Sequence, residues 1–152
     1  MVSFDTNVLV YATAAVADAK AERARELMVR AMRAATSVLL LQTLAEFCNV
    51  AIRKARIPIA DIHRTIEAWC AVLPVQAADD SDLFAALAVV RAHRFSFWDA
   101  MLWASAKRAG VSHLLTEDLQ DGFVFQGVTF INPFRRENDQ VIERILPSSR
   151  SA

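Results

Sequence analysis

Glycine, proline and cysteine are scarce in this chain of 152 residues, which has three Gly, four Pro and two Cys. So few chain-breaking residues, with 55% hydrophobic residues, argue against a disordered protein. The length fits one domain. Cys48 and Cys70 lie in apolar helical patterns without a Cys partner at metal-ligand spacing, so we expect buried free thiols in a reducing compartment. A disulfide or a thiol nucleophile is not expected.

The chain also lacks a net charge, because 17 basic and 17 acidic residues cancel. Any contact with a nucleic acid must therefore use local basic patches. Three clusters are candidates, although a solvated surface is the simpler interpretation of any one of them. They are Arg53, Lys54 and Arg56; Lys107 and Arg108; and Arg135 and Arg136.

Long apolar runs are missing as well. No run reaches the roughly 18 residues of a membrane span. The apolar stretch 8–17 resembles the core of a signal peptide, but no basic residue precedes Lys20 and Asp5 stands in the position of a basic leader. We therefore expect a cytoplasmic protein without a membrane segment. A dinucleotide site is excluded because no Gly-x-Gly-x-x-Gly follows the first strand.

The hydrophobic pattern predicts alternating strands and helices. Strands are expected at 2–4, 37–41, 72–76, 112–116 and 128–131, and helices at 6–13, 17–33, 59–71, 80–92 and 98–109, with another whose apolar stripe spans 44–55. This alternation predicts an α/β sandwich with a mainly parallel sheet. Residues 1–134 are expected to form the domain, and 135–152 a polar, weakly ordered tail or a short docking helix.

Four acidic residues, Asp5, Glu46, Asp99 and Asp118, are expected just after strands or in the first turn of the following helix. The carboxyl ends of parallel strands share one edge of the sheet, where ligands bind. Four carboxylates in one crevice repel each other unless a cation lies between them, and a hard divalent cation prefers oxygen ligands. Each acid alone also has a structural explanation, as a helix cap or as a first-turn acid that complements the helix dipole.

Several neighbouring residues fit the metal interpretation. Thr6, Asn7, Ser96 and Thr116 are placed to orient a carboxylate or a bound water, and Asp121 and Glu117 are adjacent acids that are expected at the surface or behind the ligands. Asn49 and Arg53 follow Glu46 on one helix face, which could line a groove for a substrate or could simply be solvated.

These contexts resemble the PIN-domain family, and within it the VapC-type toxins of bacterial toxin–antitoxin pairs. The resemblance rests on four motifs in order, which span residues 2 to about 132. They are Asp5-Thr6-Asn7-Val8-Leu9-Val10-Tyr11, Gln42-x-Leu44-x-Glu46-Phe47, Ser96-x-x-Asp99-Ala100, and Thr116-Glu117-Asp118-Leu119-Gln120-Asp121-Gly122.

The resemblance implies a three-layer α/β/α fold and an endoribonuclease that depends on Mg²⁺ or Mn²⁺. It also implies homodimers, and inhibition by an antitoxin whose C-terminal segment lies across the active-site groove. Asp5, Glu46 and Asp99 would be the core metal ligands, with Asp118 binding directly or through water. Metal-assisted hydrolysis predicts 5′-phosphate and 3′-hydroxyl ends.

Other functions are weighed against this one. Attack by the RNA's own 2′-hydroxyl usually needs a positioned base, but His63, His93 and His113 lie in predicted helices or strands without a catalytic pattern. A phosphatase of the haloacid-dehalogenase type normally needs a second Asp, two residues after the first, as its acid/base, but Asn7 occupies that position here. The remaining alternative is a catalytically idle PIN-like module that only binds RNA or a partner.

Overall fold

The computed structural model describes residues 1–16, 18–93 and 95–148. The strands are β1 (Val2–Phe4), β2 (Leu39–Leu40), β3 (Val75–Gln76), β4 (His113–Leu115), β5 (Val124–Phe125) and β6 (Val128–Ile131). The helices are α1 (Thr6–Thr13), α2 (Ala19–Arg33), α3 (Leu41–Arg53), α4 (Ile59–Cys70), α5 (Asp80–Ala92), α6 (Phe97–Arg108) and α7 (Asp139–Ile145), with a 3₁₀ turn, η1, at Arg136–Asn138. Within these ranges, none of the helices has the length and apolar character needed to cross a membrane.

The strands form a mainly parallel sheet, as predicted. β1 pairs in parallel with β4, and β4 with β6, while β5 forms an antiparallel hairpin with β6. β2 and β3 form a second parallel pair, which a bridge between Val2 and Ser37 joins to β1. The central strand β1 is buried at all three positions, because helices cover both faces of the sheet.

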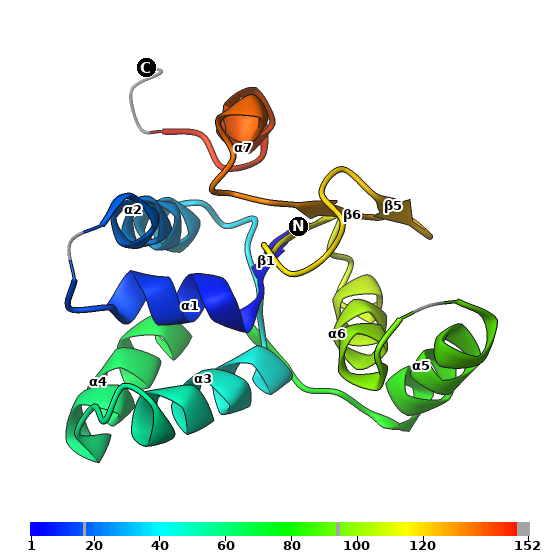
Figure 1. Cartoon of the computed structure of the whole chain (residues 1–152), viewed down its shortest axis with the longest axis horizontal. Helices are drawn as coiled ribbons and strands as arrows, with labels where there is room; N and C mark the ends of the chain where they lie inside the picture. Colours follow the sequence, from blue (N-terminus) through cyan, green and yellow to red (C-terminus); the bar gives the residue numbers. More distant parts are fainter. Residues whose placement is uncertain (17, 94, 149–152) are drawn as a thin grey trace.

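Helices on the two faces of the sheet make the predicted three-layer α/β/α arrangement. Figure 1 shows α7 on one side of the sheet and α3, α5 and α6 on the other. Apolar residues on one stripe of α2 are buried, whereas its charged residues lie on the remaining surface of the helix, where two of its arginines contact α7. Asp18 begins this helix by accepting a hydrogen bond from the Ala21 amide at 2.8 Å.

A buried ion pair fastens α5 to α6. Asp82 is 2% exposed and accepts hydrogen bonds from Arg108 at 2.8 Å and from Ser105 at 3.1 Å. Although burial disfavours the charged form, the Arg108 hydrogen bond holds the pKa of Asp82 below its usual value. Arg108 also donates to the Ala77 carbonyl at 2.5 Å, so this member of the predicted basic cluster is engaged within the protein.

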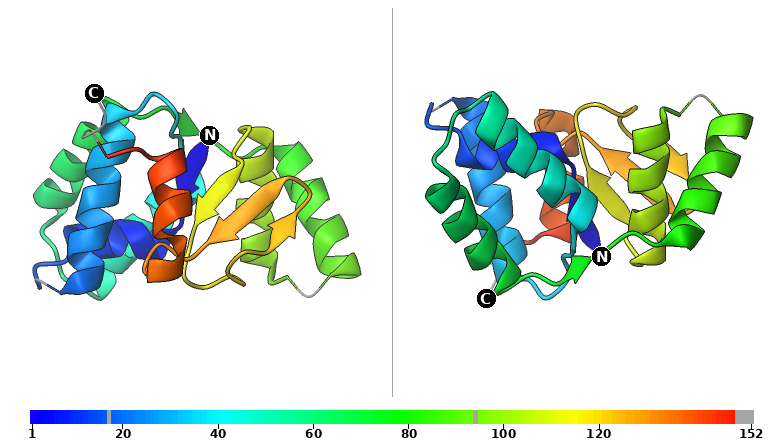
Figure 2. Two further views of the ribbon diagram at one scale, coloured as in Figure 1. Left: turned by 90° about the horizontal axis from the view of Figure 1, so that it is seen from above. Right: turned by 90° about the horizontal axis from the view of Figure 1, so that it is seen from below.

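The chain beyond residue 134 contains a docking helix, one of the two alternatives expected there. Seen from above, α7 lies across the sheet beside α2 (Figure 2). Ile142 and Leu146 are fully buried in the core that α7 shares with α1, α2 and α3. Residues 149–152 of the expected tail lie outside the described residues, and the domain boundary at 134 stays a prediction.

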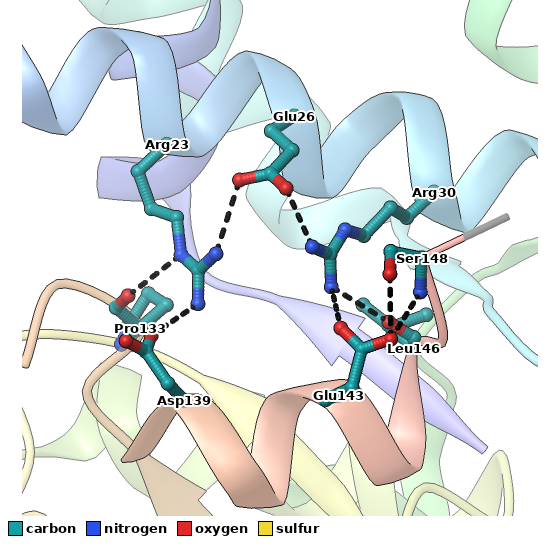
Figure 3. A network of polar contacts seen from close by, with 8 residues as sticks. All are labelled: Arg23, Glu26, Arg30, Pro133, Asp139, Glu143, Leu146 and Ser148. Atoms are coloured by element: carbon teal, nitrogen blue, oxygen red, sulfur yellow. Dashed lines mark hydrogen bonds and ion pairs between the residues drawn. The ribbon is translucent and has the colours of Figure 1, made fainter. Parts of the chain in front are cut away.

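Two arginines of α2 hold α7 in place (Figure 3). Arg23 pairs with Asp139 at 2.7 Å, and Arg30 pairs with Glu143 at 2.9 Å. Glu26 lies between the two arginines and contacts both, at 3.0 and 2.5 Å. Because the two ion pairs are two turns apart on α2 and four residues apart on α7, they fix both the position and the direction of the short helix.

Several predicted boundaries were wrong. The strand expected at 37–41 contracts to Leu39–Leu40, and α3 begins at Leu41 rather than near 44. The strand expected at 72–76 contracts to Val75–Gln76, because the amides of Val72 and Leu73 bond back to the Trp69 carbonyl. α2 begins at Ala19; Ala17, where we expected it to start, lies outside the described residues.

Two further features differ from expectation. Strand β5 was missed because its turn to β6 is only Gln126–Gly127, both with positive φ angles of 44° and 91°. This is the backbone of a tight hairpin, which Asn-Gly signals more strongly than Gln-Gly. Cys70 is exposed and Cys48 is half-buried, so the expectation of two buried thiols was wrong, although both are free.

Candidate active site

Asp5 is the most buried of the four acids, with 9% of its surface exposed. It follows β1 and caps α1, because its carboxylate accepts a hydrogen bond from the Thr6 amide at 2.6 Å. The Thr116 hydroxyl donates to the other carboxylate oxygen, also at 2.6 Å. Burial, together with the nearby charges of Asp118 and Glu46, raises the pKa of Asp5 to about 6, although the two hydrogen bonds oppose the shift.

Asp118 lies beside Asp5 because β1 and β4 are parallel neighbours, with Phe4 paired to Leu115. The chain therefore leaves both strands at the same edge of the sheet. The side-chain amide of Asn7 donates to Asp5 at 3.3 Å and to Asp118 at 3.1 Å. The backbone amide of Asp118 donates to the Thr116 hydroxyl at 3.1 Å, which links the two acids a second time.

Glu46 approaches the same edge from α3. One of its carboxylate oxygens accepts a hydrogen bond from the Thr6 hydroxyl at 2.9 Å, and the other from Gln42 at 3.0 Å. The interpretation of Glu46 as a first-turn acid was wrong, because α3 begins at Leu41 and has no acid in its first turn. Glu46 thus faces the carboxylate of Asp5 without a helix-dipole role.

Asp99 is not joined to the other three acids by a hydrogen bond or ion pair between described residues, and its bonds go to Ser96 instead. It lies in the first turn of α6, which follows α5 without a strand between them. Ser96 caps α6 by accepting from the Asp99 amide at 3.1 Å, and its hydroxyl donates to the Asp99 carboxylate at 2.6 Å. Asp99 lines a small pocket with Leu119, the residue after Asp118. The carbonyl of Trp98 accepts a hydrogen bond from Gln42 at 3.2 Å, which connects the start of α6 to α3.

The donor atoms of this site fit a hard divalent cation. In the described part of the chain, no three His, Cys, Asp or Glu side chains lie close enough together to form a metal site by themselves. However, the Asn7 amide oxygen is buried there without a hydrogen-bond partner in the structure. A cation near Asp5 would also relieve the repulsion from Asp118 and Glu46 that helps to raise its pKa. Carboxylate and amide oxygens are ligands that Mg²⁺ and Mn²⁺ accept.

The two adjacent acids have other partners. Asp121 accepts hydrogen bonds from the Asn132 amide and the Asn138 side chain, both at 2.8 Å, so its hydrogen bonds go to the segment that leads to α7. Glu117 accepts from Tyr11 at 2.7 Å and from Lys20 at 2.5 Å. This ion pair compensates a negative charge directly beside Asp118.

Gln42 positions the Glu46 carboxylate through a hydrogen bond. It is part of the second motif, but the sequence did not predict it as a site residue. Its amide nitrogen contacts both Glu46 and the Trp98 carbonyl, so one side chain sets the distance between α3 and α6. The available signal is the spacing of Gln42 and Glu46, which lie four residues apart on one helix face. The bridge to Trp98 crosses 56 residues of sequence and has no local signal.

A groove opens next to Glu46, between α3 and the start of α6. Its volume is about 710 Å³, and its lining residues are Leu41, Gln42, Ala45, Glu46, Asn49, Ala78, Trp98 and Met101. Asn49, a predicted RNA contact, thus lines the groove, whereas Arg53 is not among the lining residues.

The histidines have contacts of their own. His63 pairs with Glu67 at 3.2 Å on the surface of α4, and His113 lies 3.0 Å from the Ser112 hydroxyl. His93 caps the end of α5 rather than lying inside the helix, and its ring packs 5.0 Å from that of Phe125.

The PIN domain family model matches residues 2–123. Among solved structures, a toxin–antitoxin complex from Klebsiella pneumoniae is similar, with a TM-score of 0.65 and 17% identity over 88% of this chain and 98% of that one. The sarcin-ricin loop cleaving toxin VapC20 of Mycobacterium tuberculosis has a TM-score of 0.59 and 19% identity, over 78% and 90%. FitAcB from Neisseria gonorrhoeae has a TM-score of 0.59 and 15% identity, over 89% and 99%. A comparison with curated proteins found no match.

Proposed function

Because this chain belongs to the PIN domain family, we propose that it is a metal-dependent endoribonuclease that hydrolyses RNA phosphodiester bonds. The observation that supports the proposal is the set of hydrogen bonds that links Asp5 to Glu46 on one side and to Asp118 on the other. Thr6 connects the first two acids, and Asn7 connects Asp5 to Asp118. In the part of the chain that the structure describes, none of these three carboxylates forms an ion pair with a Lys or Arg, so a divalent metal would compensate their charge.

Asp5, Glu46, Asp99 and Asp118 would hold Mg²⁺ or Mn²⁺, with Asp99 entering from the start of α6. When bound, such an ion supplies polarisation of a phosphoryl oxygen and a lowered pKa for a water ligand. Thr6, Asn7, Ser96 and Thr116 orient the carboxylates through the hydrogen bonds described above. Asp5 must be ionised to act as a ligand, so its pKa of about 6 favours reaction above that pH.

The expected products have 5′-phosphate and 3′-hydroxyl ends. Formation of a cyclic phosphate would need a base at the RNA 2′-hydroxyl, usually a histidine. His63, His93 and His113 each contact residues outside the group of four acids. Asn7 occupies the position where a haloacid-dehalogenase phosphatase has a second Asp, and its amide donates to Asp5 and Asp118 instead of offering an acid.

We further propose that the chain is a VapC-type toxin that a cognate antitoxin neutralises. The support is the PIN family membership together with similar structures that are described as a toxin–antitoxin complex and as an RNA-cleaving toxin. These structures are less than 20% identical to this chain, so the partner and the RNA target need their own experiments.

A homodimer is part of the same proposal. The helices between Lys20 and Ala71 are one candidate for the interface, because a chain with 55% hydrophobic residues is expected to leave apolar surface exposed. The exposed apolar side chains of α5 offer a second candidate, because Leu83, Phe84, Leu87 and Val90 recur on this helix with 39%, 68%, 51% and 37% exposed surface. Large exposed apolar patches of this kind mark interaction sites.

The test is an RNA-cleavage assay, in which antitoxin-free protein is incubated with a pool of structured RNAs in Mg²⁺ or Mn²⁺. The same protein with EDTA and an Asp99→Asn variant are the two samples that are expected to be inactive. Asp80→Asn is the matched control, because Asp80 is an exposed aspartate in the first turn of α5. We expect metal-dependent cuts with 5′-phosphate ends for the wild type and the control only. Cyclic-phosphate ends would contradict the mechanism. Absence of both cleavage and metal binding would favour the idle binding module.

A further inference from the structure

We propose that the groove between α3 and α6 is a nucleobase-binding subsite, in which Trp98 stacks on an RNA base that flanks the scissile phosphate. This inference rests on the proposed nuclease function and names where the substrate's bases are held. The groove volume of about 710 Å³ lies within the range of roughly 300–1,000 Å³ that is typical of small-molecule pockets. The groove includes Glu46, so a strand bound at the four acids continues directly into it.

Trp98 has the exposure that stacking requires. Its side chain is 63% exposed, whereas the other two tryptophans, Trp69 and Trp103, are 6% and 2% exposed. Its ring contacts Phe97 edge to face at 5.3 Å, so the neighbouring aromatic supports the indole from the side. The adjacent residue is Asp99, so a base on the indole lies next to the proposed metal site. Unpaired bases of single-stranded RNA bind to aromatic faces of this kind.

The rest of the lining favours a neutral, flat group over a phosphate. Among the described residues that line it there is no lysine or arginine, and Glu46 is the one charged residue. Anionic groups of the RNA are therefore disfavoured in the groove. Gln42 and Asn49 supply amide groups at its edge. The Gln42 amide nitrogen is used within the protein, but its oxygen accepts no hydrogen bond from the described residues. These amides match the hydrogen-bonding edges of a base.

A protein segment fits the groove less well than a base does. An apolar helix on Trp98, Leu41 and Met101 would cover the amides of Gln42 and Asn49, and each amide left unpaired would cost binding energy. A base can contact both parts of the groove, because its apolar face packs on the apolar side chains and its polar edge hydrogen-bonds to the amides. Gln42 also holds the groove open, because it bonds to Glu46 on one wall and to the Trp98 carbonyl on the other.

The chain offers a direct optical test, because Trp98 is the one tryptophan of three with a largely exposed side chain. The Asp118→Asn protein, in which the proposed metal site is impaired so that cleavage is not expected, is titrated with single-stranded RNA decamers in Mn²⁺ while tryptophan fluorescence is recorded. We expect quenching of the exposed tryptophan signal, and loss of that response in Trp98→Phe. If RNA binds, as shown by anisotropy of a labelled decamer, but leaves the tryptophan fluorescence unchanged, Trp98 does not contact a base and the inference is overturned.

The side-chain series separates stacking from apolar contact. Trp98→Phe keeps an aromatic face, whereas Trp98→Leu keeps apolar surface without one. We expect Trp98→Leu to weaken RNA binding by about 5- to 150-fold, the usual loss for one stacked base, and Trp98→Phe to retain most of the affinity. Equal effects of Phe and Leu would contradict stacking. Circular dichroism of each variant checks that the fold is retained.

Cleavage of a mapped RNA completes the test. Each nucleotide that flanks the cut is replaced in turn by an abasic residue, and kcat/KM is measured for the wild type and for Trp98→Leu. We expect one flanking position at which an abasic residue lowers kcat/KM of the wild-type protein. At the same position the abasic residue should leave kcat/KM of Trp98→Leu unchanged, because this variant has already lost the stacking contact. Metal-dependent cleavage that is indifferent to Trp98 at every position would overturn the subsite and leave the nuclease proposal intact. Absence of wild-type cleavage would count against the nuclease proposal itself.

Discussion

The side-chain amide of Asn7 donates hydrogen bonds to Asp5 and to Asp118, at 3.3 and 3.1 Å, and so ties together the residues that follow β1 and β4. The Thr116 hydroxyl links the same two residues, because it donates to the Asp5 carboxylate and accepts from the Asp118 backbone amide. The amide oxygen of Asn7 is buried without a hydrogen-bond partner in the structure, so the described hydrogen bonds of this side chain are those of its nitrogen to the two acids.

The first prediction concerns this bridge. Asn7→Ala should weaken Mn²⁺ binding by about 10- to 100-fold, the usual cost of losing a residue that orients metal ligands. Isothermal titration calorimetry measures the affinity. Asn49→Ala is the matched control, because Asn49 lies in the groove on α3 and is expected to leave the affinity unchanged. An unchanged Mn²⁺ affinity in Asn7→Ala would refute the positioning role.

The second prediction follows from the pKa of Asp5, which rises from 3.8 to about 6 on folding. Between these two pH values the folded protein binds more protons at Asp5 than the unfolded chain does. Stability from this group is therefore fully present below pH 4 and is lost as the pH rises through 6. The loss amounts to about 3 kcal/mol in metal-free protein.

Urea unfolding of metal-free protein between pH 4 and 7 measures this effect. Asp5→Asn serves as the reference, because carboxylates that do not interact with Asp5 cancel in the difference, while its coupling to Asp118 and Glu46 is part of the effect that is measured. We expect the stability of the wild type relative to Asp5→Asn to fall as the pH rises. Saturating Mn²⁺ should reverse the fall at pH 7, since the ion binds the ionised wild-type site. A difference that stays flat with pH would show that Asp5 titrates normally.

Much of the fold is predictable because local signals mark its boundaries. Helix α5 begins at the Asp79 capping box, and α6 ends before Gly110, whose φ angle is 73°. The ends of β1 and β6 also agreed with the pattern, because both strands are short apolar runs. The four acids were recognisable because each stands in a distinctive local motif.

What the sequence did not predict depends on contacts between distant segments. The hydrogen bond from Gln42 to the Trp98 carbonyl joins residues that are 56 positions apart. The ion pair between Lys20 and Glu117 joins residues that are 97 positions apart. Neither leaves a periodic trace in the sequence. Asp99 lies in the first turn of α6, one of the two positions expected for the acids, and its place in the metal site stays a prediction.

The third prediction concerns the C-terminal helix. Ile142 is fully buried, so Ile142→Ala should lower the free energy of unfolding by about 2–4 kcal/mol. Asp139→Ala removes an ion pair whose carboxylate is 58% exposed and should cost no more than about 1 kcal/mol. Urea denaturation of both variants provides the measurement. Similar, small losses in the two variants would mean that residues 1–134 fold independently of α7, as the predicted domain boundary implies.

The last prediction distinguishes two interfaces for the proposed homodimer. Phe84 is 68% exposed on α5, and Ile59 is 72% exposed at the start of α4, within the segment that the sequence suggested. A charge in a buried apolar interface is costly, so Phe84→Glu should weaken dimerisation by at least about 30-fold if α5 forms the contact.

Sedimentation velocity at micromolar concentration measures the dissociation constants of the wild type, Phe84→Glu and Ile59→Glu. We expect a dimeric wild type, a monomeric Phe84→Glu variant and a dimeric Ile59→Glu variant. Both substitutions exchange an equally exposed apolar side chain for the same charge, so a general loss of solubility would affect them alike. The opposite result would place the interface on the helices between Lys20 and Ala71, and a monomeric wild type would contradict the homodimer altogether.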